Sequence, residues 1–197
     1  MINLIKKLTL IVFIATLSTT AISIEPQEFI QTTVDKASKI LSNKASDKQK
    51  IESLKLIAIE TVDVKGIGLY TLGKYRKNLT EEQKEIYSKL FKDYFLKSFS
   101  NRLVEWTDPQ IIVNSQEVLN ANYTMVNSTL KATNERPEIK IDWRVYTKVI
   151  DKPLIRDVVI EGLSLGRTQK EEFSSIINSN DGDIDILFKT LEDFINS

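Results

Sequence analysis

The spacing of apolar residues changes once along this chain, near residue 108, and this change limits the folds that it can adopt. Before Asp108 the apolar residues recur every three or four positions, as in helices that bury one face. After Pro109 they alternate with polar residues, as in strands that bury one face. Helical spacing returns at about residue 168. Helices before and after one block of strands predict an α+β domain.

The strongest predicted helix runs from Glu81 to about Glu105. Thr80 and Gln83 have the spacing of a capping box, so the start of this helix is well specified. One stripe of the helix is rich in aromatic rings, which either fill the core or form part of the wall of a ligand cavity. The stripe consists of Ile86, Tyr87, Leu90, Phe91, Tyr94, Phe95, Ser98, Phe99 and Leu103. Other helices are predicted at residues 27–42, 47–63, 168–178 and 183–195.

Four strands are predicted, at residues 111–119, 122–132, 138–149 and 154–165. Short polar turns separate them, which favours an antiparallel meander over parallel crossovers. The third strand has the clearest pattern, with apolar residues on one face and charged residues on the other. Its apolar face consists of Ile139, Ile141, Trp143, Val145 and Val149. The prediction is therefore a four-stranded antiparallel sheet with one dry face, packed with amphipathic helices.

The first 23 residues have the pattern of a cleavable secretory signal peptide. Lys6 and Lys7 precede an apolar run of ten residues, which is too short to span a membrane. Ala21 and Ser23 are small residues suited to cleavage after Ser23, so we expect a single mature domain, residues 24–197, free in solution. That domain has 25 basic and 27 acidic residues, and this balance disfavours nucleic-acid binding.

The side-chain inventory removes most catalytic chemistry. The chain contains no histidine and no cysteine, which excludes the common catalytic triads, thiol nucleophiles and the usual zinc ligands. Carboxylates remain, on the strands at Asp142, Asp157 and Glu161. A general acid among them would need a pKa raised by burial, whereas pairing with Arg144 and Arg156 across the sheet favours ionised structural carboxylates.

A basic cluster precedes the aromatic helix at Lys74, Arg76 and Lys77. It suits contact with lipid phosphates or an acidic partner, and it equally suits a solvated helix end.

Several segments, taken together, resemble the MlaC or toluene-tolerance (Ttg2-type) auxiliary family. They are residues 72–77 (Leu-Gly-Lys-Tyr-Arg-Lys), residues 79–83 (Leu-Thr-Glu-Glu-Gln), the aromatic helix, residues 157–164 (Asp-Val-Val-Ile-Glu-Gly-Leu-Ser) and Glu172-Phe173. Their order and spacing both match, and the resemblance covers about residues 25 to 194.

The resemblance implies a phospholipid-binding shuttle in the periplasm, with phospholipid as cargo and neither catalysis nor a cofactor. Its implied partners are an outer-membrane lipoprotein complex and the inner-membrane MCE-domain subunit of an ABC transporter. It also implies that the sheet is curved and that sheet and helices surround an apolar cavity for the acyl chains. The lipid-binding residues expected on this basis are Phe91, Phe95, Phe99, Val126, Leu130, Ile141, Trp143, Val145, Val158, Ile160 and Leu163. Strict alternation places Leu163 on the opposite face from Val158 and Ile160, so a bulge near Gly162 is needed for all three to share a face.

Two other functional classes stay open alongside the carrier. A ligand-free periplasmic adaptor would have a filled core, and a ketosteroid-isomerase-like enzyme of the same α+β type would depend on Asp157 or Asp142. A carrier would instead be purified with lipid bound.

Overall fold

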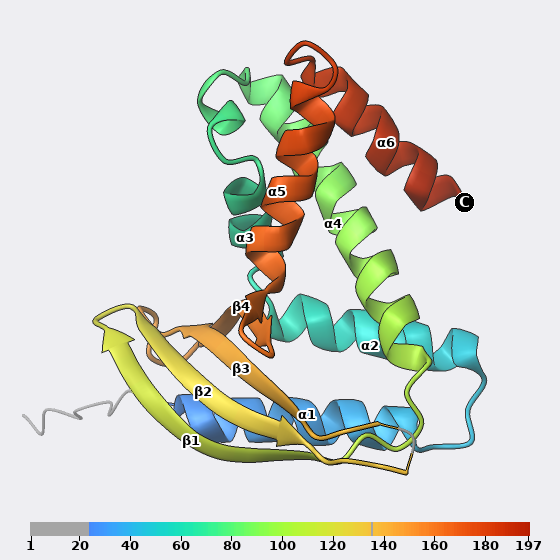
Figure 1. Ribbon diagram of the computed structural model, residues 1–197, viewed down its shortest axis with the longest axis vertical. Coiled ribbons are helices and arrows are strands. Elements are labelled where there is room, and N and C mark those ends of the chain that lie inside the picture. The colour runs from blue at the N-terminus through green and yellow to red at the C-terminus, as the bar shows by residue number, and fades with distance from the viewer. Residues whose placement is uncertain (1–23, 135) are drawn as a thin grey trace, which may run out of the picture.

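The computed structural model describes residues 24–134 and 136–197, so the predicted signal peptide lies outside the described residues. Six α-helices, one short 3-10 helix and a five-stranded sheet make up the described part (Figure 1). The helices are α1 (Pro26–Leu41), α2 (Asp47–Thr61), α3 (Val64–Thr71), η1 (Tyr75–Lys77), α4 (Glu81–Val104), α5 (Leu165–Asn178) and α6 (Ile184–Asn196). The strands are β1 (Ile111–Asn120), β2 (Tyr123–Leu130), β3 (Ile139–Tyr146), β4 (Leu154–Ile160) and β5 (Leu163–Ser164). The predicted α+β class is confirmed.

The sheet is an antiparallel meander in the order β1-β2-β3-β4-β5. The prediction of four strands was wrong at residues 154–165, because the chain reverses there. Glu161 and Gly162 both have positive φ, 49° and 82°, which is the backbone of a tight hairpin turn. Leu163 and Ser164 therefore pair back onto Ile160 and Val159 as β5, and α5 begins at Leu165 rather than at residue 168.

One face of the sheet is apolar and α1 lies against it. Residues of β2 alternate strictly between buried and partly buried positions, as the predicted alternation requires. Ile30 and Val34 of α1 pack in one cluster with Val126, Val145 and Ile155 of the sheet. A bulge at Arg156 of β4, opposite the step from Arg144 to Val145, shifts the pairing of the last two strands.

Capping boxes start two of the helices. Thr80 and Gln83 form the predicted capping box at the start of α4. A second capping box starts α2, and it is formed by Ser46 and Gln49, with Ser46 directly before residue 47, where the helix was predicted to begin. Among the described residues, no helix combines the length and the apolar character needed to cross a membrane.

The buried apolar side chains form two separate cores. The helical core contains residues of α4, α5 and α6 and of the segment between α3 and α4, and its members are Leu72, Leu79, Tyr87, Phe91, Phe173, Ile177, Leu187, Phe188 and Leu191. The sheet core consists of Ile30, Val34, Val126, Val145 and Ile155. Figure 1 shows the sheet and α1 at one end of the molecule and α4, α5 and α6 at the other, and α2 packs on both α1 and α4. The molecule is thus built from a helical half and a sheet half, bridged by α2.

Candidate functional site

The predicted lipid-binding residues of the strands share the apolar face of the sheet. Val126 and Val145 are fully buried members of the sheet core. Trp143 and Val158 are cross-strand partners that pack against this core and stay partly buried. The register places the remaining strand residues on the same face, with Leu130 and Ile141 buried and Ile160 partly buried.

The orientation of Trp143 is fixed by a short polar chain on this otherwise apolar face. The indole Nε1 donates a hydrogen bond of 2.8 Å to Ser128 Oγ, and that hydroxyl donates one of 2.9 Å to the carbonyl of Ile141. Both polar groups are therefore satisfied without water. The ring of Trp143 is held as a fixed part of the apolar surface.

The predicted aromatic residues of α4 lie in or next to the helical core. Phe91 is 2% exposed, and its ring contacts four others, including Tyr87 and Phe173. This burial favours the core-filling interpretation for Phe91. Phe95 packs against the same core and stacks on Phe99 with ring centroids 5.6 Å apart, and both rings are only partly buried. The aromatic stripe thus runs from a filled core toward a less covered surface.

Leu163 differs from the other predicted residues. It is 59% exposed and lies directly after the Glu161-Gly162 turn, paired with Ile160. The feature at Gly162 is therefore a chain reversal rather than the bulge that we expected. This position places Leu163 at the margin of the candidate site, not inside it.

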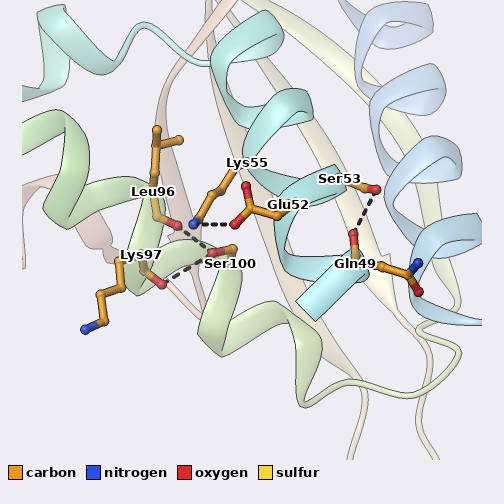
Figure 2. A network of polar contacts seen from close by, with 7 residues as sticks. All are labelled: Gln49, Glu52, Ser53, Lys55, Leu96, Lys97 and Ser100. Atoms are coloured by element: carbon orange, nitrogen blue, oxygen red, sulfur yellow. Dashed lines mark hydrogen bonds and ion pairs between the residues drawn. The ribbon is translucent and has the colours of Figure 1, made fainter. Parts of the chain in front are cut away.

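Helices α2 and α4 pack against each other, and Figure 2 shows polar contacts made by residues of both helices. Ser100 is fully buried in α4, and its hydroxyl donates to the carbonyl of Leu96 in its own helix at 2.6 Å. On α2, Glu52 pairs with Lys55 at 2.8 Å and Ser53 donates to the carbonyl of Gln49 at 2.9 Å. Each contact drawn there stays within one helix, and no hydrogen bond or ion pair is described between residues 47–61 of α2 and residues 81–104 of α4.

Asp157 has a role that the sequence analysis missed. This carboxylate is 8% exposed and accepts hydrogen bonds from the Ser164 hydroxyl at 2.6 Å and from the Gly166 N–H at 3.0 Å. Ser164 in turn caps α5 by accepting from the Arg167 N–H. The Asp-x-x-x-Glu-Gly-x-Ser element is therefore a joint between the sheet and the start of α5, and its Glu-Gly pair forms the turn that makes this contact possible.

A second joint connects β4 to the segment between α2 and α3. Arg156 Nε donates to Asp63 Oδ2 at 2.6 Å, and its NH1 group donates to the Tyr123 hydroxyl at 2.7 Å. The guanidinium also lies 3.7 Å from the ring centroid of Tyr146. Burial alone would lower the pKa of Arg156, but the bonds to Tyr123 and Asp63 outweigh it and raise the pKa. Arg156 thus pairs with Asp63, and not with a strand carboxylate as we expected.

The strand carboxylates are engaged in structural contacts. Asp142 accepts a hydrogen bond from the Asn127 amide at 2.8 Å, and Glu161 accepts one from the Lys140 N–H. Arg144 lies 3.9 Å from Asp157, which agrees with the predicted pairing across the sheet. Within the described residues, no group of three or more acidic side chains converges as a metal site.

The burial of Tyr87 explains its perturbed ionisation. Its hydroxyl shares a hydrogen bond of 2.8 Å with Thr71 Oγ1 inside the helical core. Burial raises the pKa of Tyr87 well above its usual value, and the bond from Thr71 only partly opposes this shift. The hydroxyl therefore serves the packing of α3 on α4 as a neutral group.

Comparison with known proteins identifies the family. A model of the family described as MlaC protein matches residues 31–193, which is most of the chain. The chain belongs to the MlaC family. The resemblance seen in the sequence is thereby confirmed.

This MlaC protein has low sequence identity to two similar proteins. The toluene tolerance protein Ttg2D of Pseudomonas putida is 22% identical over 191 residues, covering 94% of this chain and 88% of the relative. A solved structure of the phospholipid-binding protein from Ralstonia solanacearum, in complex with a phospholipid, superposes with a TM-score of 0.74 at 18% identity. The superposition covers 88% of this chain and 98% of the other, so the two proteins share their fold.

Proposed function

We propose that this MlaC protein binds a phospholipid where the apolar face of its sheet meets the helical half. One observation carries the proposal: apolar side chains at the margins of the sheet core and of the helical core stay partly buried. On the sheet these are Trp143, Val158 and Ile160, and on α4 they are Phe95 and Phe99. The phospholipid bound by the Ralstonia solanacearum protein of the same fold supports this assignment.

Some of the expected lipid-binding residues are buried. We place them behind the binding surface, where they support it without touching the ligand. Packed cores are as dense as organic crystals, so side chains in the second layer fix the positions of those in the first. Five expected residues belong to this layer: Phe91, Val126, Leu130, Ile141 and Val145. Leu163 would contact the lipid at the protein surface.

The binding energy available to acyl chains makes unaided release slow. Each buried methylene contributes roughly 0.8 kcal/mol, so a chain of about 16 carbons contributes on the order of 10 kcal/mol before ordering costs. A partner that opens the site removes this barrier. Helices α2 and α4 are in contact, and no hydrogen bond or ion pair is described between residues 47–61 and residues 81–104. This supports such a movement, because no described polar bond between the two helices has to break when they shift.

The proposed place of action is the periplasm, after removal of residues 1–23. There the protein would exchange lipid with the inner-membrane MCE subunit of an ABC transporter and with an outer-membrane lipoprotein complex. This step is tested by mixing lipid-loaded protein with the purified MCE subunit and measuring the phospholipid on each after separation. Transfer at equilibrium supports the shuttle, and retention of all lipid by the loaded protein contradicts it.

The binding step itself is tested by mass spectrometry of an organic-solvent extract of the purified mature protein. We expect diacyl phospholipid in a defined molar ratio. An extract without lipid, from protein that is folded by circular dichroism and that takes up no phospholipid from vesicles, would contradict the proposal. The cleavage prediction is tested separately, because amino-terminal sequencing of the periplasmic protein should read Ile24 first.

A further inference from the structure

A polar hollow of about 520 Å³ lies beside α5 in the helical half. Helix α5 contributes Arg167, Lys170, Ser174 and Asn178 to its lining, and α3 contributes Tyr70. The residues from α5 are three or four positions apart, so they form one stripe along the helix. The hollow therefore runs along α5 on a face that is separate from Phe173 and Ile177 of the helical core.

The length of this stripe suits a short extended peptide. From Arg167 to Asn178 the helix rises by about 16 Å at 1.5 Å per residue. An extended chain advances by about 3.3 Å per residue, so roughly five residues span the same distance. The lining offers hydroxyl and amide groups throughout, which can pair with the backbone of such a chain.

The position of Lys170 is built into the fold. Its ammonium lies 5.4 Å from the ring centroid of Tyr70, and its stem passes over Gly73. A Cβ at Gly73 would lie 2.9 Å from Lys170 Cε, and the φ of +54° there also favours glycine. A glycine at residue 73 thus makes room for the lysine as well as ending the preceding helical segment.

The cations around the hollow have no acidic partners within the described residues. The described ion pairs all lie elsewhere in the molecule, and none of them includes a cation of this group. The group consists of Arg167, Lys170 and the neighbouring Lys74, Arg76 and Lys77. The hydroxyl of Tyr75 donates a hydrogen bond to the Asn178 amide oxygen, which holds η1 beside the hollow together with its two cations, Arg76 and Lys77, and the preceding Lys74. One acidic residue, Glu171, also belongs to the lining, so the positive charges outnumber it.

We propose that this hollow docks an extended acidic segment of a partner protein. Arg167 is suited to bidentate pairing with a carboxylate, and Lys170 supplies a second charge one helical turn further on. A membrane surface fits less well, because it is broad and cannot enter a concave site, and because interfacial binding relies on apolar side chains that insert. The inference goes beyond lipid binding, since it assigns a partner to a surface that the proposed cargo does not touch.

The test uses the mature chain, residues 24–197, and a fluorescent hexaglutamate peptide as the probe. Arg167→Ala combined with Lys170→Ala should weaken binding by about ten-fold in fluorescence anisotropy at low salt, the effect expected for two lost ion pairs. The matched control is Lys89→Ala combined with Lys92→Ala, which removes two exposed positive charges from α4. We expect the control to change the affinity by less than about two-fold.

Three further readouts sharpen the test. Amide chemical shifts of the labelled protein should change most between residues 167 and 178 when the peptide is added. Circular dichroism checks the fold, and Arg167→Gln with Lys170→Gln replaces the alanine pair if that pair fails to fold. Equal weakening by the α4 control would overturn the proposal. The proposal would also be overturned if the Arg167 and Lys170 substitutions weakened binding of the protein to vesicles containing phosphatidylglycerol but left its binding to the peptide unchanged.

Discussion

The helical half and the sheet half of this protein bury their apolar residues in different ways. The helical core has nine buried members, and the rings of Tyr87, Phe91, Phe173 and Phe188 are linked by direct contacts. The sheet core has five members, all aliphatic, and Trp143 and Val158 are partly buried at its margin. One half is filled by its own side chains, whereas the other presents apolar surface that is incompletely covered.

This difference separates stability from binding within one domain. Burial of apolar area is the main favourable term in folding, so the half with the larger closed core should carry more of the stability. Pockets for apolar ligands need the opposite property, an apolar wall that the protein does not fill by itself. Substitutions in the helical core should therefore mainly lower stability, whereas substitutions on the apolar face of the sheet should mainly lower lipid binding.

The largest loss of stability is expected for Phe91→Ala. Removing a ring that is 2% exposed leaves a cavity in the helical core, which costs about 3–5 kcal/mol. Urea denaturation measures the loss, and Phe99→Ala is the matched control because that ring is only partly buried. Equal losses for the two variants would contradict the distinction between a filled core and its margin.

The next largest loss of stability is expected at Asp157, which links β4 to the start of α5. Asp157→Ala leaves the Ser164 hydroxyl and the Gly166 N–H without their acceptor, which should cost about 1–3 kcal/mol. Asp142→Ala is the comparison on the same face of the neighbouring strand, and we expect about 1 kcal/mol or less there because Asp142 is only partly buried and accepts its described hydrogen bond from the Asn127 amide alone. If the order of the two losses in urea denaturation were reversed, Asp157 would not be the anchor of α5.

A smaller loss of stability but a large loss of lipid is expected for Val158→Asp. Its side chain lies on the apolar face opposite Trp143, whereas Val159 pairs with Asp142 on the other face. A carboxylate at residue 158 would bring an unpaired charge against the acyl chains, which costs several kcal/mol of binding. Val159→Asp should retain its phospholipid in the same extraction. Equal lipid content in both folded variants would show that the apolar face of the sheet does not contact the lipid.

The smallest effect is a pH dependence that belongs to the helical half. Because burial raises the pKa of Tyr87, the unfolded chain loses this proton near pH 10 while the folded chain retains it. Stability supplied by the neutral hydroxyl is therefore present below about pH 10 and declines as the pH rises above it. Tyr87→Phe should show a flatter decline in urea midpoint between about pH 9 and 11. An unchanged slope would mean that Tyr87 ionises equally in both states.

Local signals made much of the fold predictable from the sequence. The capping box at Thr80 and Gln83 and the alternation from Ile139 to Val145 depend on neighbouring residues, and both were predicted correctly. The placement of Val149 on the dry face was wrong, because β3 ends at Tyr146 and Val149 is 48% exposed beyond it. The turn at Glu161 and Gly162 was missed because the apolar pattern continues through it, so the segment resembled one long strand.

The missed parts of the site depend on contacts between distant segments. Asp63 and Arg156 are 93 positions apart, and spacing alone carries no sign of their pairing. Periodicity showed that α4 and the strands each have an apolar face, but it could not show that Phe91 and Val126 belong to different cores.

The two tryptophans allow the most direct test of lipid binding at the sheet face. Trp143 lies on that face, while Trp106 lies beyond the end of α4 and stacks with Arg136 at 4.4 Å. Trp106→Phe leaves Trp143 as the single reporter, and Trp143→Phe leaves Trp106. Both proteins are loaded with phospholipid brominated along its acyl chains, and their fluorescence is compared with that of protein loaded with the unbrominated lipid. We predict strong quenching of Trp143 and little quenching of Trp106; equal quenching of both, or an unquenched Trp143 in loaded protein, would contradict binding at this face.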